Sequence, residues 1–346
     1  MIDPSLAYLV FLSLLSVLLS AVAITDLARR YAAHKMLIDH PNERSSHSLP
    51  TPRGGGLGIA IPFFCMVAGL GWLNMLAEEL VWVLLGGGGM VALIGWLDDH
   101  KHVAVGYRIL VHLLAACWAV FWLGDVATLR LGELAISLHW AGTVLTVVAI
   151  VWLINLYNFM DGIDGLAGTE AASAAVAGGI LLWLSGLPGL ALVACALAAA
   201  SSGFLIRNWP PAKIFMGDVG SGLLGFIFAV LALAGTTSGN FPVLIWLVLL
   251  GIFIMDASYT LLARIWRGEP WLQAHRTHAY QRLIQMGMSH RRVTLYALAI
   301  NVVLLWPIAV LVWWMPNLST PLLLGILTGG GLLWVGIQRK FAAIVR

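Results

Sequence analysis

Long apolar runs separated by short polar segments make up nearly the whole chain. Runs of this length can cross about 30 Å of hydrocarbon as helices. No repeat or long linker interrupts the pattern, so residues 1–346 are expected to form a single membrane domain. The fold expected is an all-α polytopic membrane protein with about eleven transmembrane helices, at 5–25, 56–76, 80–97, 109–124, 140–157, 169–186, 188–206, 219–236, 241–262, 293–314 and 319–337.

One segment breaks the helical pattern. Residues 128–138 alternate between apolar and polar positions around Gly132 and Glu133. Such alternation around a two-residue turn predicts a small β-hairpin, here between the fourth and fifth helices.

Basic residues are distributed unequally among the polar segments. If residues 26–55 are cytoplasmic, so are 98–108, 157–168, 207–218, 263–292 and the tail after 337. These segments hold every Lys and Arg except Arg130. Because cytoplasmic loops are rich in Lys and Arg, we expect the N-terminus outside, the C-terminus in the cytoplasm and the hairpin in the periplasm.

Composition agrees with this class. The chain is 60% hydrophobic and 10% charged, with a mean hydropathy of +0.92. That balance excludes a soluble domain. The three cysteines lie inside apolar runs without metal-type spacing, so they are interpreted as packing residues.

The main candidate for chemistry is the segment 155–166, which follows the fifth apolar run. Asn155, Asn158, Asp161 and Asp164 recur at every third position. Residues three apart share a helix face, so adjacent pairs can meet one ligand. These oxygen ligands, without Cys or clustered His, suit Mg²⁺ carrying phosphates better than Zn²⁺. The alternative is a polar helix end at the membrane surface.

Three further aspartates, in two segments, lie on the same predicted cytoplasmic side. Asp98 and Asp99 end the third run, and adjacent helical residues point about 100° apart, so they are expected to be unequal. Asp218 follows a glycine-rich turn that opens a helix, where backbone N–H groups favour phosphate. A carboxylate there repels phosphate unless a cation lies between them, which is an argument for Mg²⁺. A solvated helix end is the alternative for the Asp98–Asp99 pair.

The loop 263–292 carries arginines together with His275 and His278. Guanidinium and imidazole groups suit a diphosphate and sugar hydroxyls. A basic patch on anionic lipid would explain the arginines but not the histidines. Phe215 suits either stacking on a base or packing at the membrane interface.

Taken together, Arg53-Gly-Gly-Gly56, Asp98-Asp99, residues 155–166, residues 215–221 and the histidine loop resemble the polyprenyl-phosphate N-acetylhexosamine-1-phosphate transferases, glycosyltransferase family 4. The resemblance implies transfer of a sugar-1-phosphate from a UDP-N-acetylhexosamine to undecaprenyl phosphate, with release of UMP. It also implies Mg²⁺ as cofactor, with Mn²⁺ as a substitute, and an active site on the cytoplasmic face of a bacterial inner membrane. No nucleic acid partner is expected, and a homodimer is left open.

The resemblance also implies roles for individual residues. Asp218 and Asn158 are expected to bind the metal, and the catalytic residues are expected to be Asp98, Asp99, Asp161 and Asp164. The expected substrate-binding residues are Arg53, Asn155, Gly165, Leu166, Lys213, Phe215, His275, Arg276, His278 and Arg282.

The loop 275–282 departs from the histidine-rich forms of the translocase and GlcNAc branches. With Arg44-Ser-Ser-His47, it looks more like the branch that starts O-antigen or other surface polysaccharide synthesis. The alternatives are the phospho-MurNAc-pentapeptide translocase reaction in peptidoglycan synthesis and, from another class, a membrane transporter. A transporter predicts acidic residues near span centres, and Asp256 is the exception that fits it.

Overall fold

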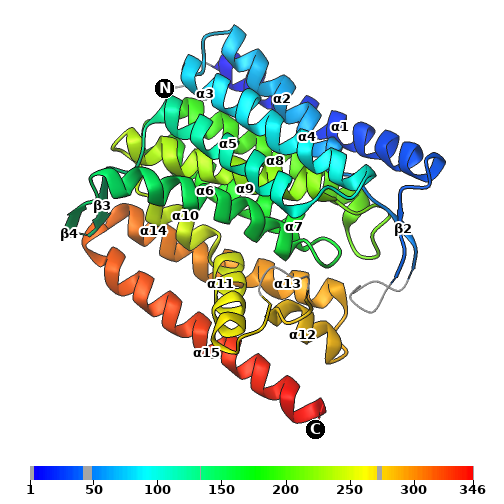
Figure 1. Ribbon diagram of the computed structural model, residues 1–346. Coiled ribbons are helices and arrows are strands. Elements are labelled where there is room, and N and C mark those ends of the chain that lie inside the picture. Colours follow the sequence, from blue (N-terminus) through cyan, green and yellow to red (C-terminus); the bar gives the residue numbers. More distant parts are fainter. Residues whose placement is uncertain (1–3, 42–48, 133, 271–274, 346) are drawn as a thin grey trace.

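The computed structural model describes residues 4–41, 49–132, 134–270 and 275–345. Most of them are helical (Figure 1). The α-helices are α1 (Pro4–His34), α2 (Leu57–Trp72), α3 (Glu78–Trp82), α4 (Gly88–His100), α5 (Val105–Leu123), α6 (Trp140–Met160), α7 (Leu166–Leu184), α8 (Pro188–Asn208), α9 (Asp218–Thr237), α10 (Val243–Leu249), α11 (Gly251–Trp266), α12 (Ala279–Gln285), α13 (His290–Ile300), α14 (Trp306–Trp314) and α15 (Ser319–Val345). Two π-helical segments, η1 (Val83–Gly87) and η2 (Asn301–Leu305), continue into α4 and α14, and a short 3-10 helix η3 (Pro316–Leu318) precedes α15.

Each of the eleven predicted runs is helical, which confirms the predicted fold class. Among the described residues, nine helical spans are long and apolar enough to cross a membrane. The helices α10 and α11 are bent by 81° at their junction and make a tenth if they form one span. The remaining run, α2, has only 16 residues. At 1.5 Å per residue it is about 24 Å long, short of the hydrocarbon thickness. The expected eleven spans therefore become nine or ten.

Two small antiparallel sheets complete the described structure. The strands β3 (Thr128–Leu131) and β4 (Leu134–Ser137) pair with Leu131 opposite Leu134, which confirms the predicted hairpin. The pair of β1 (Ile38–Asp39) and β2 (Thr51–Pro52) was not foreseen, because two-residue strands leave no periodic signal. The two sheets lie on opposite sides in Figure 1, with the β3–β4 hairpin on the left and β2 on the right.

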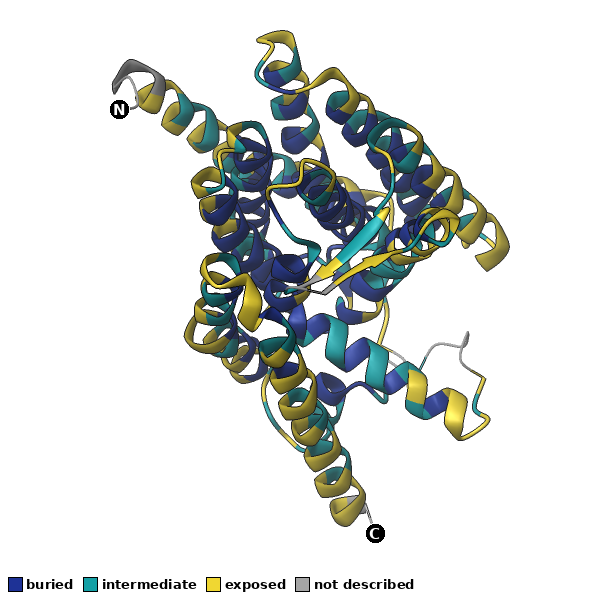
Figure 2. Cartoon of the chain, turned by 90° about the vertical axis from the view of Figure 1, so that its left-hand side faces the viewer, coloured by how far each residue is buried: buried dark blue, intermediate teal, exposed yellow. Residues whose placement is uncertain are grey.

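Burial is greatest at the centre of the bundle. Nearly all of α9 and most of α7 are buried, whereas α15 is largely exposed (Figure 2). Small residues permit this close packing in the interior. A Cβ on Gly225 of α9 would collide with the backbone of α6 at Leu153 and Ile154. The helix α9 is therefore held in register by its neighbours.

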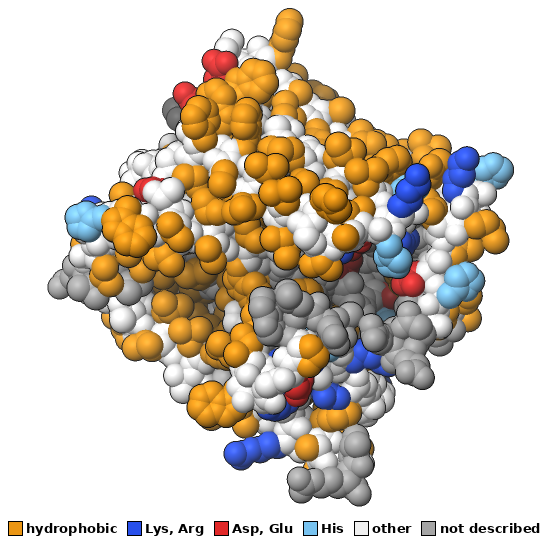
Figure 3. Space-filling model, viewed as in Figure 1, with side chains coloured by type: hydrophobic (Ala, Val, Ile, Leu, Met, Phe, Trp, Pro, Cys, Tyr) orange, Lys and Arg blue, Asp and Glu red, His pale blue; other side chains and the backbone are white. Residues whose placement is uncertain are grey.

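The outer surface is apolar over the middle of the face in Figure 3, and basic side chains gather at the right-hand and lower edges. This arrangement is that of a multi-pass membrane protein, with apolar side chains toward lipid and charges at helix ends. Placement of the site-bearing ends in the cytoplasm stays a prediction.

Candidate active site

The start of α9 is built around Asp99. Gly217 precedes the helix with φ at 75°, a conformation that favours glycine. The Asp99 carboxylate accepts hydrogen bonds from the backbone nitrogens of Asp218 at 3.1 Å and Val219 at 3.3 Å. A side chain on Gly217 would collide with this carboxylate. Asp99, on α4, thus supplies the N-terminal cap of α9 from a different helix.

Asp98 points elsewhere, as the adjacency argument predicted. Its carboxylate accepts from the backbone nitrogen of Val103 at 2.8 Å and from Nη1 of Arg108 at 3.0 Å. The second guanidinium nitrogen of Arg108 lies 2.7 Å from Oδ2 of Asp218. Arg108, on α5, therefore bridges two of the predicted site carboxylates. The sequence analysis missed it, although a lone arginine at the start of an apolar span is itself a signal.

Asn158 lies beside Asp218, as predicted. Its amide nitrogen donates to Oδ1 of Asp218 at 2.8 Å and to Oγ of Ser221 at 3.1 Å. Both bonds use the nitrogen, so the amide oxygen stays a ligand atom for a cation.

Asp161 immediately follows the last residue of α6 and is half-buried. Within the described residues its carboxylate has no hydrogen bond or ion pair. Burial and the neighbouring carboxylates Asp218, Asp99 and Asp164 raise its pKa well above the usual range. A negative potential of this kind stabilises a bound cation.

Asp164 has structural contacts on several sides. Its carboxylate accepts from the backbone nitrogen of Ala212 at 3.0 Å and lies 3.2 Å from Nδ1 of His290. Its carbonyl oxygen accepts from Oγ1 of Thr294 at 3.1 Å. These bonds tie the loop before α7 to α13 and to residue 212. They give Asp164 a structural role, and its catalytic role stays a prediction.

Arg53 stabilises the end of α4. Its guanidinium donates to the carbonyl oxygen of Asp99 at 2.7 and 3.0 Å and to that of Asp98 at 3.3 Å. A basic side chain on terminal carbonyls is a favourable C-terminal cap. The neighbouring Gly56 donates its backbone N–H to the carbonyl of Met216 at 2.8 Å. The Arg53–Gly56 motif thereby contacts both the Asp98–Asp99 end of α4 and the segment directly before Asp218.

The remaining predicted substrate residues near α6 and α9 are dispersed. The Asn155 amide donates to the Val151 carbonyl at 2.7 Å and contacts His112 at 3.4 Å, so it is not among the carboxylates. Lys213 is exposed and Phe215 is half-buried. Gly165 and Leu166 are buried at the start of α7.

Asp256 organises the described part of the histidine loop. Its carboxylate accepts from the backbone nitrogens of Ala279 at 2.7 Å and Tyr280 at 3.2 Å, so it caps α12 from α11. The Tyr280 hydroxyl donates to the Phe159 carbonyl at 3.0 Å, beside Asp161. Burial raises the pKa of Tyr280, so this hydroxyl stays a donor. Asp256 is therefore a capping residue here, not part of an ion path.

The His275 and His278 rings stack with centroids 4.9 Å apart. Burial, followed by the influence of His278 and Arg264, lowers the pKa of His275 to about 4. His275 is therefore neutral at pH 7 and acts through hydrogen bonds, not charge. Arg282 lies over the Phe341 ring at 3.9 Å and bonds Gln285. The Arg276 carbonyl accepts from the Gln285 side chain at 3.1 Å.

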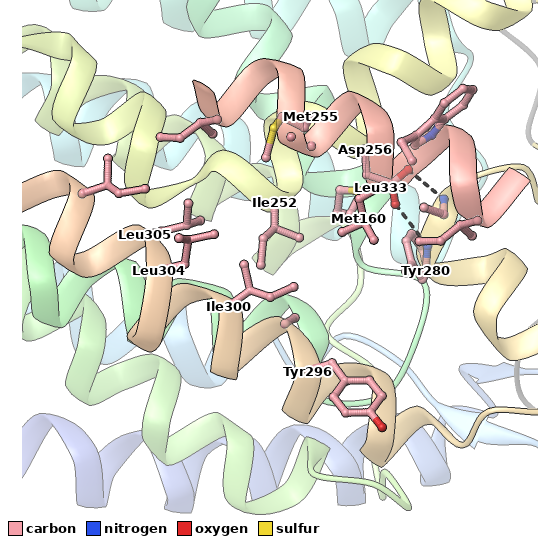
Figure 4. Close-up of a pocket in the computed structure, with 18 of the residues that line it drawn as sticks. Met160, Ile252, Met255, Asp256, Tyr280, Tyr296, Ile300, Leu304, Leu305 and Leu333 are labelled. Carbon is pink, nitrogen blue, oxygen red and sulfur yellow. Dashed lines mark hydrogen bonds between the residues drawn. The ribbon is translucent and has the colours of Figure 1, made fainter. Parts of the chain in front are cut away.

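An apolar cavity of about 580 Å³ adjoins the carboxylate-bearing loop. It lies between α11, α12, the α13–η2–α14 span and α15 (Figure 4). Met160 and Leu166, which flank the segment 161–165, line it together with Asp256 and Tyr280. The polar site and the apolar cavity thus share a boundary.

The donor set fits a hard divalent cation. No three His, Cys, Asp or Glu side chains converge as a ligand group within the described ranges. Mg²⁺ needs only one or two carboxylates, because water and substrate phosphates complete its shell. Asp218 and the partnerless Asp161 carboxylate, with the Asn158 oxygen, meet that requirement.

Comparison with known proteins agrees with this site. The profile of Glycosyl transferase family 4 matches residues 81–236. The probable undecaprenyl-phosphate N-acetylglucosaminyl 1-phosphate transferase of Bacillus subtilis is 31% identical over 306 residues, 84% of this chain and 81% of the relative. The undecaprenyl-phosphate alpha-N-acetylglucosaminyl 1-phosphate transferase of Salmonella typhi is 29% identical, over 81% of this chain and 77% of the relative. A phospho-N-acetylmuramoyl-pentapeptide-transferase of Synechococcus elongatus is 32% identical, over 70% of this chain and 69% of the relative.

The fold, the site and these matches define a membrane-bound sugar-phosphate transferase. The chain belongs to Glycosyl transferase family 4, and the relatives named above are bacterial proteins. This confirms the resemblance and the predicted enzyme class, a polyprenyl-phosphate sugar-1-phosphate transferase. The transporter alternative is thereby excluded.

Proposed function

We propose that this enzyme transfers an N-acetylhexosamine-1-phosphate from a UDP-sugar to undecaprenyl phosphate, with release of UMP. The observation that carries the proposal is the shared boundary between the apolar cavity and the segment 161–165. A polyprenyl phosphate needs an apolar channel that ends at polar, phosphate-binding groups, and this boundary offers both.

In the proposed reaction, an oxygen of the acceptor phosphate attacks the phosphorus bonded to the sugar. A new P–O bond forms there, and the bond from that phosphorus to the oxygen of UMP breaks. UMP leaves with the electron pair, and the product is a lipid diphosphate that carries the sugar. Positioning and charge stabilisation supply most of the rate enhancement in such transfers.

Asp218, Asp161 and the Asn158 oxygen would hold Mg²⁺, for which Mn²⁺ can substitute. The bound cation supplies charge neutralisation for the diphosphate and the departing UMP. Arg108 offers its guanidinium to the acceptor phosphate, since it already lies between Asp98 and Asp218. Asp98 orients this guanidinium, and Asp99 holds Asp218 in place through the cap of α9.

The histidine loop is proposed to bind the donor. Asp256 holds α12, and Tyr280 fixes α12 to the end of α6, the helix that carries Asn158. Arg282 lies on α12, and His275, Arg276 and His278 directly precede it. The loop departs from the histidine-rich branches, which favours initiation of O-antigen or another surface polysaccharide over peptidoglycan synthesis. The site is proposed to face the cytoplasm, where UDP-sugars are made.

Purified protein incubated with undecaprenyl phosphate, Mg²⁺ and a panel of UDP-N-acetylhexosamines tests the proposal. UMP release should require the acceptor, the metal and one of the donors. Asp218→Asn should nearly abolish release while the protein stays folded. Release from UDP-MurNAc-pentapeptide alone would instead indicate the translocase reaction, and no release with any donor would refute the proposal.

A further inference from the structure

A buried carboxyl lies outside the site described above. Glu170, on α7, is only 1% exposed, and so is Asn301, the first residue of η2. The Asn301 amide nitrogen donates to Oε2 of Glu170 at 2.5 Å. These residues are 131 positions apart, so the contact joins two different membrane spans.

The pair belongs to a series of polar contacts between α7 and the α13–η2–α14 span. Their positions rise along both segments, which therefore run parallel. Besides Glu170 with Asn301, the series comprises Thr294 Oγ1 to the Asp164 carbonyl (3.1 Å), Trp306 Nε1 to Ser173 Oγ (3.2 Å) and Trp313 Nε1 to Ser185 Oγ (2.8 Å). The pair is the contact within this series in which an ionisable side chain takes part, and Glu170 is buried in the first turns of α7.

Hydrogen-bond accounting at this pair leaves two acceptors unsatisfied. Within the described residues neither Oε1 of Glu170 nor Oδ1 of Asn301 has a hydrogen-bond partner. No Lys, Arg or His of those residues forms an ion pair with Glu170. The Tyr157 hydroxyl on α6, which is within electrostatic range of Glu170, is also unpaired. An ionised carboxylate without a counter-ion is very costly in such surroundings.

A single proton on Glu170 supplies the missing hydrogen-bond donor. A proton on Oε1 turns that oxygen into a donor toward the Asn301 amide oxygen, while Oε2 keeps its bond from the Asn301 nitrogen. We propose that Glu170 is a neutral carboxylic acid in a two-point hydrogen-bonded pair with Asn301. In this pair Glu170 acts as a positioning residue. It fixes how the α13–η2–α14 span, which lines the apolar cavity, is aligned along α7.

The alignment of this span along α7 matters because the span forms one side of the apolar cavity. Ile300, the last residue of α13, and Leu304 and Leu305 of η2 line the cavity on either side of Asn301 in the sequence (Figure 4). The same pair connects this wall to α7, the helix that begins directly after the Asp161–Gly165 loop. A π-helical segment within a helix commonly marks a functional position. The part of the inference that concerns the acceptor rests on the proposed function.

Three readouts test the inference. In infrared difference spectra at neutral pH, wild type minus Glu170→Gln should show the carbonyl stretch of a protonated carboxylic acid. Glu170→Gln should retain acceptor KM within about threefold, because an amide can make both hydrogen bonds. Glu170→Leu should raise acceptor KM about tenfold and leave donor KM unchanged. The matched control is Ser185→Ala, which removes a bond at the far end of the same interface and should leave both KM values unchanged.

Absence of the protonated-acid band, or equal damage from Gln and Leu, would overturn the neutral pair. An unchanged acceptor KM in Glu170→Leu would overturn its positioning role. The infrared comparison and the Gln variant still test the neutral pair even if the Leu variant does not fold. If the wild type showed no acceptor-dependent activity, the proposed function would fail, whereas the infrared result would still decide the state of Glu170.

Discussion

The backbone nitrogen of Asp218 donates a hydrogen bond to the Asp99 carboxylate at 3.1 Å, so one predicted site carboxylate holds the other in place. The second oxygen of Asp99 accepts from Val219. Because both oxygens are committed to the first turn of α9, Asp99 has little freedom to act on a substrate. Asp98 faces Arg108 instead.

Because Asp99 caps α9 and Asp98 contacts Arg108, substitutions of the two aspartates should cause different defects. Asp99→Asn should lower the melting temperature, because one carboxylate acceptor at a helix N-terminus becomes a donor, at a cost of about 1 kcal/mol. Asp98→Asn should reduce turnover about 10²-fold with a smaller change in melting, since an amide oxygen can still accept from Val103. Thermal melts and UMP assays on both variants provide the check. Identical profiles for the two would contradict the assignment.

Arg108 should lower the affinity of the empty site for a cation. Its positive charge lies 2.7 Å from Asp218 and 3.0 Å from Asp98. Arg108→Gln should therefore tighten Mn²⁺ binding on the order of tenfold without substrates, while turnover falls. Electron paramagnetic resonance of added Mn²⁺ measures this directly. Arg108→Lys is the matched control, because it keeps the charge and should bind Mn²⁺ as the wild type does. Unchanged Mn²⁺ affinity in the Gln variant would rule out this role.

The width of the apolar cavity should control acceptor binding. Gly329 of α15 lines it, and a Cβ there would meet no atom within 4 Å. Gly329→Leu should partly fill the cavity and raise KM for undecaprenyl phosphate on the order of tenfold, with KM for the UDP-sugar unchanged. Gly336→Leu is the control: it lies on the same helix, also in open space, but outside this cavity. Equal effects from the two substitutions would disprove acceptor binding in the cavity.

Stability should depend on His275 in acid. Its pKa falls from about 6.5 in the unfolded chain to about 4 in the folded protein. Between these values the unfolded state binds a proton that the folded state does not, so this contribution to stability is lost as pH falls from 6.5 toward 4. His275→Gln should make melting temperature less sensitive to pH in that window. His139→Gln, at an exposed position, serves as control and should melt like the wild type throughout. An unchanged acid slope in His275→Gln would refute the prediction.

The fold was largely predictable because a bilayer demands long apolar helices, and each predicted run is helical. What length and hydropathy could not show was geometry within a run. The 81° bend between α10 and α11 occurs inside one continuous apolar stretch, and only packing reveals it. The expectations of a single domain and of cytoplasmic orientation stay predictions.

The site was predictable in its residue types but less so in their roles. Charged and amide groups in an apolar chain mark candidate functional positions, which is how Asn158 and Asp218 were singled out, and the structure brings them into contact. Long-range hydrogen bonds decide the rest. Asp99 and Asp256 each cap a helix contributed by a different part of the chain, and spacing along the sequence carries no trace of that. Arg108 was overlooked because it lies apart from every motif.

The cap that Asp99 gives to α9 has a consequence for biogenesis. Spans enter the membrane in the order of synthesis, and Asp99 leaves the ribosome 119 residues before Asp218. Until α9 arrives, the Asp99 carboxylate lacks the two amides that it will bind, and a nascent chain that ends before residue 218 contains an incomplete catalytic centre. We therefore expect no transfer during early synthesis, and activity only after α9 has docked against α4.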